Sequence, residues 1–430
     1  MTAVLSKKGG FFFLYGYGGT GKTFMWKTLS AGLRSKGMIV LNVASSGIAS
    51  LLLPGGKTAH STFCIPLLIN EESTCNIAQG SLRAKLLMAF DRTLRDIMRN
   101  VDDANKDKPF GGKAVVLGGD FRQILPVIKK GSKFDIIKSS INYSVLWNCC
   151  KVLKLSKNMR LSTTSNTETA NDIQEFADWI LKIGDARMDL NENGECIVEI
   201  PEQILITNTD LPLLSLVEFV YPEFVVNMLN PNYFDDGAIL CPTNDSVEQV
   251  NDFMLSLIVQ SEWFTSEFLN DIKCSGIPNH KLKLKTGVPI MLLRNIDQAK
   301  GLCNGTRLQV KHLGKNVICA TVITGKNIGD SIFIPRMDLV PSDSGLPFKF
   351  QRRQFPISLC FAMTINKSQG QTLSRVGLYL PQPVFTHGQL YVAISRVKTK
   401  RGLKILILDE DGKVTNTTKN VVYKEIFETL

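Results

Sequence analysis

Eight residues close to the start of the chain have the types and spacing that bind phosphate groups. Residues 16–23 read Gly-Tyr-Gly-Gly-Thr-Gly-Lys-Thr and follow the apolar run 11–15. Glycines let backbone N–H groups turn toward phosphate oxygens, the lysine supplies a positive charge, and the last threonine offers a hydroxyl to Mg²⁺. We therefore expect a bound nucleoside triphosphate, and a glycine-rich turn is the alternative. The expected binding residues are Gly16, Gly18, Gly19, Thr20, Gly21, Lys22 and Thr23, with Thr23 also holding the metal.

Three polar residues further along could act on the same triphosphate. Gln123 follows the apolar run 113–117 and can hydrogen-bond a γ-phosphate or the attacking water. Arg160 and Arg396 can act as arginine fingers, which stabilise the negative charge on a transferring phosphate. For each arginine taken alone, a surface ion pair is the alternative.

The elements that position these residues follow βαβ order in the first part of the chain. Apolar runs separated by helical patterns predict a parallel sheet. We expect strands at 11–15, 38–43, 113–117 and 151–155, and helices at 24–36 and 45–53. The polar stretch 162–169 marks the end of this unit, so the first domain is placed at residues 1–165.

A second α/β unit begins at the apolar run 238–241, where Thr243 and Asn244 are candidate N-caps for a helix that reaches about residue 258. Parallel-sheet patterns return in three later runs, 355–365, 376–380 and 403–408. Between them lie short β-rich runs broken by glycines, which are typical of a small barrel. They are 289–293, 307–312, 317–323 and 331–335. The second domain is thus expected at 166–280 and 352–430, with a barrel inserted at 281–351.

Composition indicates a polyanionic partner. The chain of 430 residues has 50 Lys and Arg against 39 Asp and Glu, a net charge of +11. Nucleic acid is the leading candidate, and a membrane surface is the alternative. Against the membrane, the basic residues are dispersed and no apolar run approaches the roughly 18 residues that span a bilayer. Ten cysteines without C-x-x-C spacing suit a reducing compartment.

Several ordered sequence blocks make the chain resemble a known family. They are the phosphate loop, residues 44–49, 58–63, 118–123, 158–160, 364–372 and 389–396. In this order they are similar to those of Pif-type (petite integration frequency) DNA helicases, superfamily-one 5′-to-3′ motors, in the plant and Helitron-like branch. The resemblance implies two RecA-like parallel-sheet P-loop domains with a small SH3-like barrel in the second, and use of ATP with Mg²⁺.

The resemblance also assigns roles to individual residues. Lys22 and Thr23 bind phosphate and Mg²⁺, Gln123 senses the γ-phosphate, and Arg160 and Arg396 are the fingers. Residues expected to face single-stranded DNA are Ser46, Gly47, His60, Phe63, Lys367, Ser368, Gln369, Gly370 and Thr372. An aromatic face can stack on any base, so Phe63 suits a strand read without sequence preference. A core aromatic is the alternative for Phe63, and an ordinary hydrogen-bonding group is the alternative for His60.

Two elements of the family pattern are missing from the sequence. The family has an apolar strand ending in Asp-Glu (the Walker B motif), but here the apolar run 86–90 leads directly into Asp91, and no Asp-Glu pair follows a strand before Gln123. Only about ten residues precede the first strand, so we expect the family's helix whose glutamine reads adenine to be missing too. A truncated gene product and an evolved pseudo-motor both fit these absences.

The expected function is an ATP-dependent DNA helicase that couples ATP hydrolysis to 5′-to-3′ translocation and duplex unwinding, in DNA repair, recombination or telomere maintenance. The alternative is a catalytically impaired protein that binds nucleotide and single-stranded DNA. A metabolic P-loop kinase is disfavoured because it explains neither the second lobe nor Arg396. Expected partners are single-stranded DNA and duplex junctions, with no membrane and no small-molecule substrate besides ATP. We expect a monomer in the nucleus, with the mitochondrion as the second possibility.

Overall fold

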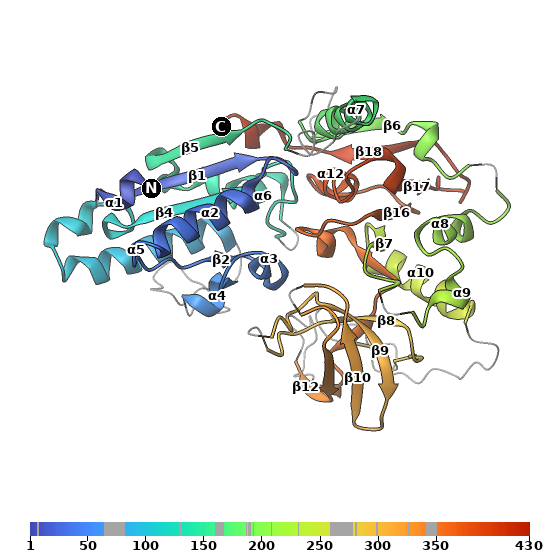
Figure 1. The fold of residues 1–430 in the computed structure, drawn as a ribbon. Coiled ribbons are helices and arrows are strands. Elements are labelled where there is room, and N and C mark those ends of the chain that lie inside the picture. Colours follow the sequence, from blue (N-terminus) through green and yellow to red (C-terminus); the bar gives the residue numbers. More distant parts are fainter. Residues whose placement is uncertain are drawn as a thin grey trace.

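The computed structural model describes most of residues 1–430. The residues outside the description are 7, 64–81, 129–130, 160–166, 186, 188–190, 192, 208, 231, 259–277, 280–281, 298–299, 326 and 341–350. The described residues form two α/β lobes side by side, and a β-rich insert extends from the second lobe (Figure 1). Among them, no helix has the length and apolar character needed to cross a membrane.

The first lobe is built on three parallel strands in the order β4-β1-β5. Strand β1 (Gly10–Gly16) lies in the centre and pairs with β4 (Ala114–Gly119) and β5 (Cys150–Leu155). A central parallel strand is covered on both faces. Accordingly, Phe11 and Phe13 are buried in two separate apolar clusters. The three strands predicted here are confirmed.

Helices cover this sheet and carry the phosphate-loop region. Helix α2 (Lys22–Arg34) starts directly after the loop that follows β1, close to the predicted bounds. Helix α5 (Leu82–Arg99) is one continuous helix of 18 residues that packs against the turn Pro109–Gly112. The shorter helices of the lobe are α1 (Thr2–Leu5), α3 (Gly47–Leu51), α4 (Ala59–Thr62) and α6 (Lys133–Lys138).

The strand predicted at 38–43 was wrong. Only β2 (Val43–Ala44) is extended there, and it pairs with β3 (Lys57–Thr58) in a short parallel ladder separate from the main sheet. Ile39 and Leu41 are 92% and 63% exposed. An apolar strand buries its side chains only when neighbouring strands extend the sheet around it. Within the described residues the main sheet stops at β4 and does not continue to β2.

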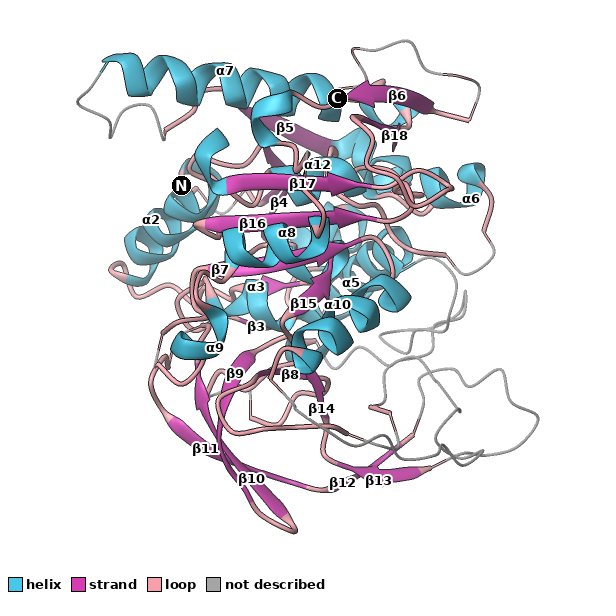
Figure 2. Cartoon of the chain, turned by 90° about the vertical axis from the view of Figure 1, so that its right-hand side faces the viewer, coloured by secondary structure: helices cyan, strands magenta, loops and turns pink. Residues whose placement is uncertain are grey.

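The second lobe has a parallel sheet in the order β15-β7-β16-β17, and Figure 2 shows these strands side by side. The strands are β7 (Gly237–Cys241), β15 (Ala362–Thr364), β16 (Arg375–Leu380) and β17 (Leu403–Ile407). Every residue of β7 is buried, as expected of an interior strand. Helices of this lobe are α7 (Thr167–Gly184), α8 (Pro212–Val220), α9 (Phe224–Asn227), α10 (Asn244–Ser256) and α12 (Gln389–Ile394). The predicted N-cap Thr243 accepts a bond from the Ser246 N–H at 3.3 Å.

The insert is an antiparallel sheet in the order β11-β10-β9-β8-β14, with a two-stranded ladder beside it. Its strands are β8 (Pro289–Leu292), β9 (Arg307–Leu313), β10 (Val317–Val322), β11 (Ser331–Pro335), β12 (Met337–Leu339), β13 (Arg352–Gln354) and β14 (Ile357–Leu359). The first four match their predicted runs closely. The run predicted as one strand at 355–365 is divided, because β14 pairs with β8 of the insert and β15 pairs with β7. The insert therefore continues past residue 351.

The last described segment returns from the second lobe to the first. Strand β18 (Thr417–Val421) pairs antiparallel with β6 (Glu195–Glu199), a ladder that the sequence analysis did not predict. Beyond it, Tyr423 and Ile426 pack in the same apolar cluster as Phe13 of the first lobe. Polar contacts add to this packing, because the Asn142 side chain donates to the Ile426 carbonyl at 3.0 Å and Lys133 pairs with Glu425 at 2.8 Å.

Candidate nucleotide and DNA site

The phosphate loop connects the end of β1 to the start of α2. Gly19 and Gly21 have φ angles of 95° and 84°, in the left-handed region where a side chain is strained. Gly21 is the N-cap of α2, so the loop leads into the N-terminus of a 13-residue helix. Free N–H groups and the helix dipole at such a terminus favour a negatively charged ligand. The geometry therefore fits the triphosphate predicted from the sequence.

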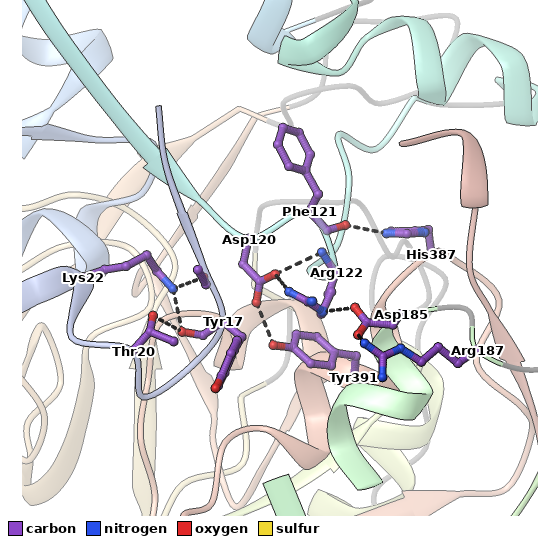
Figure 3. Close-up of polar contacts among 11 residues, drawn as sticks. Tyr17, Thr20, Lys22, Asp120, Phe121, Arg122, Asp185, Arg187, His387 and Tyr391 are labelled. Atoms are coloured by element: carbon purple, nitrogen blue, oxygen red, sulfur yellow. Dashed lines mark hydrogen bonds and ion pairs between the residues drawn. The ribbon is translucent and has the colours of Figure 1, made fainter. Parts of the chain in front are cut away.

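The loop is held around the backbone carbonyl of Tyr17. Lys22 donates to the carbonyls of Gly16 and Tyr17, the second at 2.9 Å, and the Thr20 hydroxyl donates to the Tyr17 carbonyl at 2.8 Å (Figure 3). The Tyr17 hydroxyl in turn donates to the carbonyl of Ser156 at 2.7 Å. A nucleotide would offer Lys22 phosphate oxygens in place of backbone carbonyls, which are weaker acceptors for a cation.

Thr23 lies at the exposed start of α2, where its hydroxyl can reach a metal on the phosphates. Within the part of the chain that is described, no three His, Cys, Asp or Glu side chains are grouped to hold a metal by themselves. Mg²⁺ usually retains waters and is shared between protein oxygens and substrate phosphates. Thr23 fits that use, with the nucleotide supplying further ligands.

Gln123 and Gln369 meet across the two lobes. Gln123 follows the end of β4, and Gln369 follows the short helical turn Ile365–Ser368 of the second lobe. The Gln369 side-chain amide donates to the Gln123 side-chain oxygen at 2.8 Å. A residue predicted to sense the nucleotide thus contacts a residue predicted to face DNA.

Sequence analysis missed a cluster of buried charges next to Gln123. The Asp120 side chain is completely buried; it accepts from the Tyr391 hydroxyl at 2.7 Å and pairs with Arg122 at 3.3 Å (Figure 3). Arg122 also bonds Asp185. Burial opposes the charge on Arg122, but these two carboxylates outweigh it and raise its pKa. Burial and then Asp120 raise the pKa of Tyr391 well above its usual value, so its hydroxyl donates. Asp120 follows an apolar run and lies in the family-like block 118–123, but neither signal indicated its partners.

The two predicted arginine fingers have different outcomes. Arg396 is buried and donates to acceptors of its own lobe, the carbonyls of Val392, Ser368 and Gln371 and the Ser395 hydroxyl. Arg160 lies outside the described residues. The residue before it, Met159, donates its backbone N–H to the carbonyl of Gly19 in the phosphate loop at 3.0 Å. The finger role of both arginines stays a prediction.

The strand-facing residues predicted in the first lobe lie on α3, α4 and the turn after α4. The Ser46 hydroxyl caps α3 by accepting from the Ala49 N–H at 3.3 Å. Gly47 lies against the insert, where an added Cβ would come within 2.6 Å of the Cys303 Cβ. His60 is in α4, and only its backbone is described. The ring of Phe63 is half-buried, with its centroid 4.2 Å from that of Phe90.

The strand-facing segment predicted in the second lobe contains both buried and exposed residues. Ser368 is buried and donates to the Ile365 carbonyl at 2.7 Å, so its hydroxyl is engaged within the lobe. Lys367 and Thr372 are exposed, and Gly370 has a φ of 87° that suits glycine. Contact of Lys367, Ser368, Gln369, Gly370 and Thr372 with DNA stays a prediction.

His387 is a further buried group between the lobes. Its Nε2 bonds the Phe121 carbonyl at 2.7 Å (Figure 3). Its Nδ1 accepts the Tyr423 N–H at 2.8 Å. The ring is therefore the neutral tautomer with its proton on Nε2. Burial lowers the pKa of His387 from 6.5 to about 4, although the Phe121 carbonyl and Glu425 act in the opposite direction.

The His387 pKa predicts a pH-dependent stability. His387 is protonated with a pKa near 6.5 in the unfolded chain but only with a pKa of about 4 in the folded chain. The contribution of His387 is thus present above pH 6.5 and is lost as the pH falls toward 4, by roughly 3 kcal/mol in total. We expect urea unfolding of a His387→Gln variant to show a shallower loss of stability between pH 6.5 and 4.5 than wild type. His312→Gln, at an exposed site on β9, is the control; parallel profiles for wild type and His387→Gln would contradict the assignment.

The fold and the phosphate loop define the chain as a P-loop protein with two RecA-like α/β lobes. The sequence model described as PIF1-like helicase matches residues 1–90 and 81–194, and the model of the DNA helicase Pif1 2B domain matches residues 267–313. The chain belongs to the PIF1-like helicase family.

Individual relatives agree with this assignment. The chain is 26% identical over 462 residues to the ATP-dependent DNA helicase PIF1 of Xenopus laevis, covering 98% of this chain and 62% of that protein. It is 25% identical over 423 residues to the ATP-dependent DNA helicase Pif1 of Bdellovibrio bacteriovorus, covering 92% and 83%. The crystal structure of Pif1 helicase from Bacteroides in complex with ADP-AlF3 and ssDNA shares the fold, with a TM-score of 0.60, 23% identity and coverage of 94% and 90%. The chain thus spans less than two thirds of the Xenopus relative.

Proposed function

We propose that the chain is an ATP-dependent DNA helicase that moves 5′ to 3′ on single-stranded DNA and unwinds duplexes, in DNA repair, recombination or telomere maintenance. The observation that carries the proposal is the bond between Gln123 of the first lobe and Gln369 of the second. A motor must pass a change at the nucleotide to the residues that hold the strand. The similarity to Pif1 proteins described as ATP-dependent DNA helicases, and to a Pif1 helicase crystallised with ssDNA, supports the same function.

In this function each group of residues has a distinct task. ATP with Mg²⁺ supplies the phosphoryl group, and the α2 N-terminus, Lys22 and Thr23 hold and orient it. Gln123 of the first lobe contacts the segment 367–372 through Gln369, so a shift of one lobe against the other changes the Gln123–Gln369 contact. Lys367 and Phe63 supply charge and an aromatic face to the strand. We propose that the free protein is a nuclear monomer with single-stranded DNA and duplex junctions as its partners.

A second candidate function has its own observation. Residues 82–99, where the family has an acidic strand, form one helix. The two PIF1-like matches, to residues 1–90 and 81–194, overlap in the first half of this helix. The acid in this helix next to the meeting point, Asp91, is buried; it bonds Arg95 at 2.7 Å and the Phe110 N–H at 2.5 Å. These two bonds give Asp91 a structural role within the first lobe. As the alternative to an active helicase, we therefore propose a protein that binds nucleotide and single-stranded DNA but hydrolyses ATP poorly.

DNA binding tests the part that both candidates share. With a charge of +11, we expect single-stranded DNA to bind with little sequence preference, and log K to fall with log salt at a slope of roughly −0.7 per phosphate neutralised. A salt-independent affinity would exclude the electrostatic contribution. Fluorescence anisotropy of labelled oligonucleotides at several salt concentrations measures both quantities.

A Phe63→Ala variant separates stacking from packing. Base stacking is worth about 1–3 kcal/mol, so affinity should fall roughly 5- to 100-fold without a change in the salt slope. Phe134→Ala, which removes an exposed ring on α6 of the same lobe, is the matched control. A lower unfolding midpoint with unchanged DNA affinity would assign Phe63 to packing against Phe90.

A further inference from the structure

The Asp120 carboxylate joins the two lobes through a single hydroxyl. Asp120 follows the last residue of β4 in the first lobe, and Tyr391 is in the middle of α12 in the second. Their bond is 2.7 Å long, and the side chain of Asp120 and the whole of Tyr391 are buried. The same carboxylate accepts the backbone N–H of Arg122 at 3.2 Å. A buried carboxylate that loses a donor retains its desolvation cost, so this contact is strongly favoured when the lobes meet.

Arg122 makes a second connection between the lobes. Its guanidinium bonds Asp185, the residue after α7, and Arg187 holds the other oxygen of Asp185 at 3.2 Å. On the other side, the guanidinium lies 5.5 Å from the ring centroid of Tyr15 and 5.9 Å from that of Tyr17, at the end of β1 and in the phosphate loop. Arg122 thus bonds Asp185 of the second lobe (Figure 3) while its guanidinium lies near the rings of Tyr15 and Tyr17.

Two glycines allow the backbones to approach closely at this point. A Cβ on Gly388 would lie 2.2 Å from the Arg122 carbonyl oxygen, and Gly388 has a φ of 73°. A Cβ on Gly184 would lie 2.6 Å from the Tyr391 ring and 2.9 Å from the Arg122 side chain. Packing of this tightness leaves the interface few arrangements, and a contact of this kind changes in steps rather than gradually.

We propose that Tyr391 and Asp185 are positioning residues, which together with Asp120 and Arg122 form an interlobe latch that couples nucleotide binding to DNA binding. The proposal rests on the proposed function. Helix α12 carries Tyr391 and ends just before Arg396, whose side chain donates to the carbonyls of Ser368 and Gln371 in the strand-facing segment. When the latch is closed, it fixes the relative positions of the phosphate loop, α12 and the segment 367–372. When it opens, the two ligands bind independently.

The test compares ligand coupling in matched variants. The readout is the ratio of the Kd for an oligo-dT strand without and with a non-hydrolysable ATP analogue. Tyr391→Phe keeps the ring and removes the hydroxyl. Tyr221→Phe is the control, because the buried Tyr221 hydroxyl makes a bond of similar length, 2.8 Å, to the Phe361 carbonyl within the second lobe.

We expect Tyr391→Phe and Asp185→Asn each to move this Kd ratio toward one by a factor on the order of five or more. The affinity for either ligand alone should change less than twofold. Tyr221→Phe should leave the ratio at the wild-type value even if its unfolding temperature falls. A wild-type ratio of one, or an unchanged ratio in Tyr391→Phe, would overturn the latch.

Failure of the proposed function gives a different result. If wild type binds neither ligand, the proposed function is rejected, and the latch is then judged by small-angle X-ray scattering of the free protein. The Tyr391→Phe, Asp185→Asn double variant should have a larger radius of gyration than wild type and Tyr221→Phe. Scattering curves that superimpose for all three would overturn the latch without any ligand.

Discussion

Insertion of an apolar strand ending in Asp-Glu between Met88 and Phe90 is expected to raise DNA-stimulated ATP turnover on the order of a thousandfold or more. Water is a poor nucleophile toward a phosphoryl group unless a carboxylate orients it and Mg²⁺ is held against the phosphates, and losing such groups removes several powers of ten in rate. If the second candidate function holds, the unmodified chain binds ATP and DNA yet hydrolyses ATP barely above background. Duplex unwinding should be restored together with the turnover.

The first lobe has a position for the inserted strand. Strand β4 pairs only with β1 within the described residues, and β2 lies apart from this sheet with Ile39 and Leu41 exposed before it. The insertion would divide α5 into two helices, one before and one after the new strand. An insert of the same length ending in Asn-Gln is the matched control, because it restores the sheet without the carboxylates.

Steady-state phosphate release with saturating single-stranded DNA measures the effect. The Asn-Gln insert should raise the unfolding temperature as much as the Asp-Glu insert does and leave turnover low. Fast DNA-stimulated hydrolysis by the unmodified chain, abolished by Lys22→Ala, would instead show that another acid performs the reaction. Asp120 would be the first to examine, although its side chain is buried against Tyr391 and Arg122.

A Lys22→Ala variant is expected to lose ATP binding by roughly 10- to 100-fold in Kd. The side chain supplies the cation at the β- and γ-phosphates, and a hydrogen bond to a charged group contributes about 1.5–3 kcal/mol. In the structure this lysine already lies over the loop, bonded to the carbonyls of Gly16 and Tyr17. Its removal therefore also loosens the loop that would receive the phosphates.

Isothermal titration calorimetry with ATP and Mg²⁺ measures this loss directly. Lys27→Ala removes an exposed lysine from the same helix α2 and should leave the affinity within a factor of two. Equal affinities of wild type and Lys22→Ala would reject the phosphate-loop assignment. Equal losses in both variants would show that net charge, and not the position of Lys22, determines affinity.

Local patterns predicted the elements whose neighbours are close in the sequence. The apolar run 11–15 became β1, and the four glycine-bounded runs of the insert became β8 to β11, because side-chain alternation and turn residues determine such strands directly. The run 38–43 failed because a buried strand depends on partners elsewhere in the chain. The run 355–365 failed in part because its two halves pair with different sheets.

The same distinction between local and long-range features applies to the residues of the candidate site. The phosphate loop is one continuous motif, so its residues could be named without a structure. The cluster of Asp120, Arg122, Asp185 and Tyr391 could not be named, because sequence separations of 63 and 271 residues lie between its bonded members. Taken alone in the sequence, each of these residues is interpreted as an ordinary acidic, basic or aromatic side chain at the surface. Only the fold shows that they are buried together.

The return of the chain to the first lobe has a mechanical consequence. One connection between the lobes lies between β5 and α7, and a second is the segment that carries Tyr423 and Ile426 into the apolar cluster of Phe13. A body attached to another at two separated points keeps one easy movement, a rotation about the line through those points. Sliding and twisting would stretch one attachment or the other. Opening and closing of the lobes should therefore follow a single hinge axis, and the contacts farthest from that axis should travel the greatest distance in each cycle.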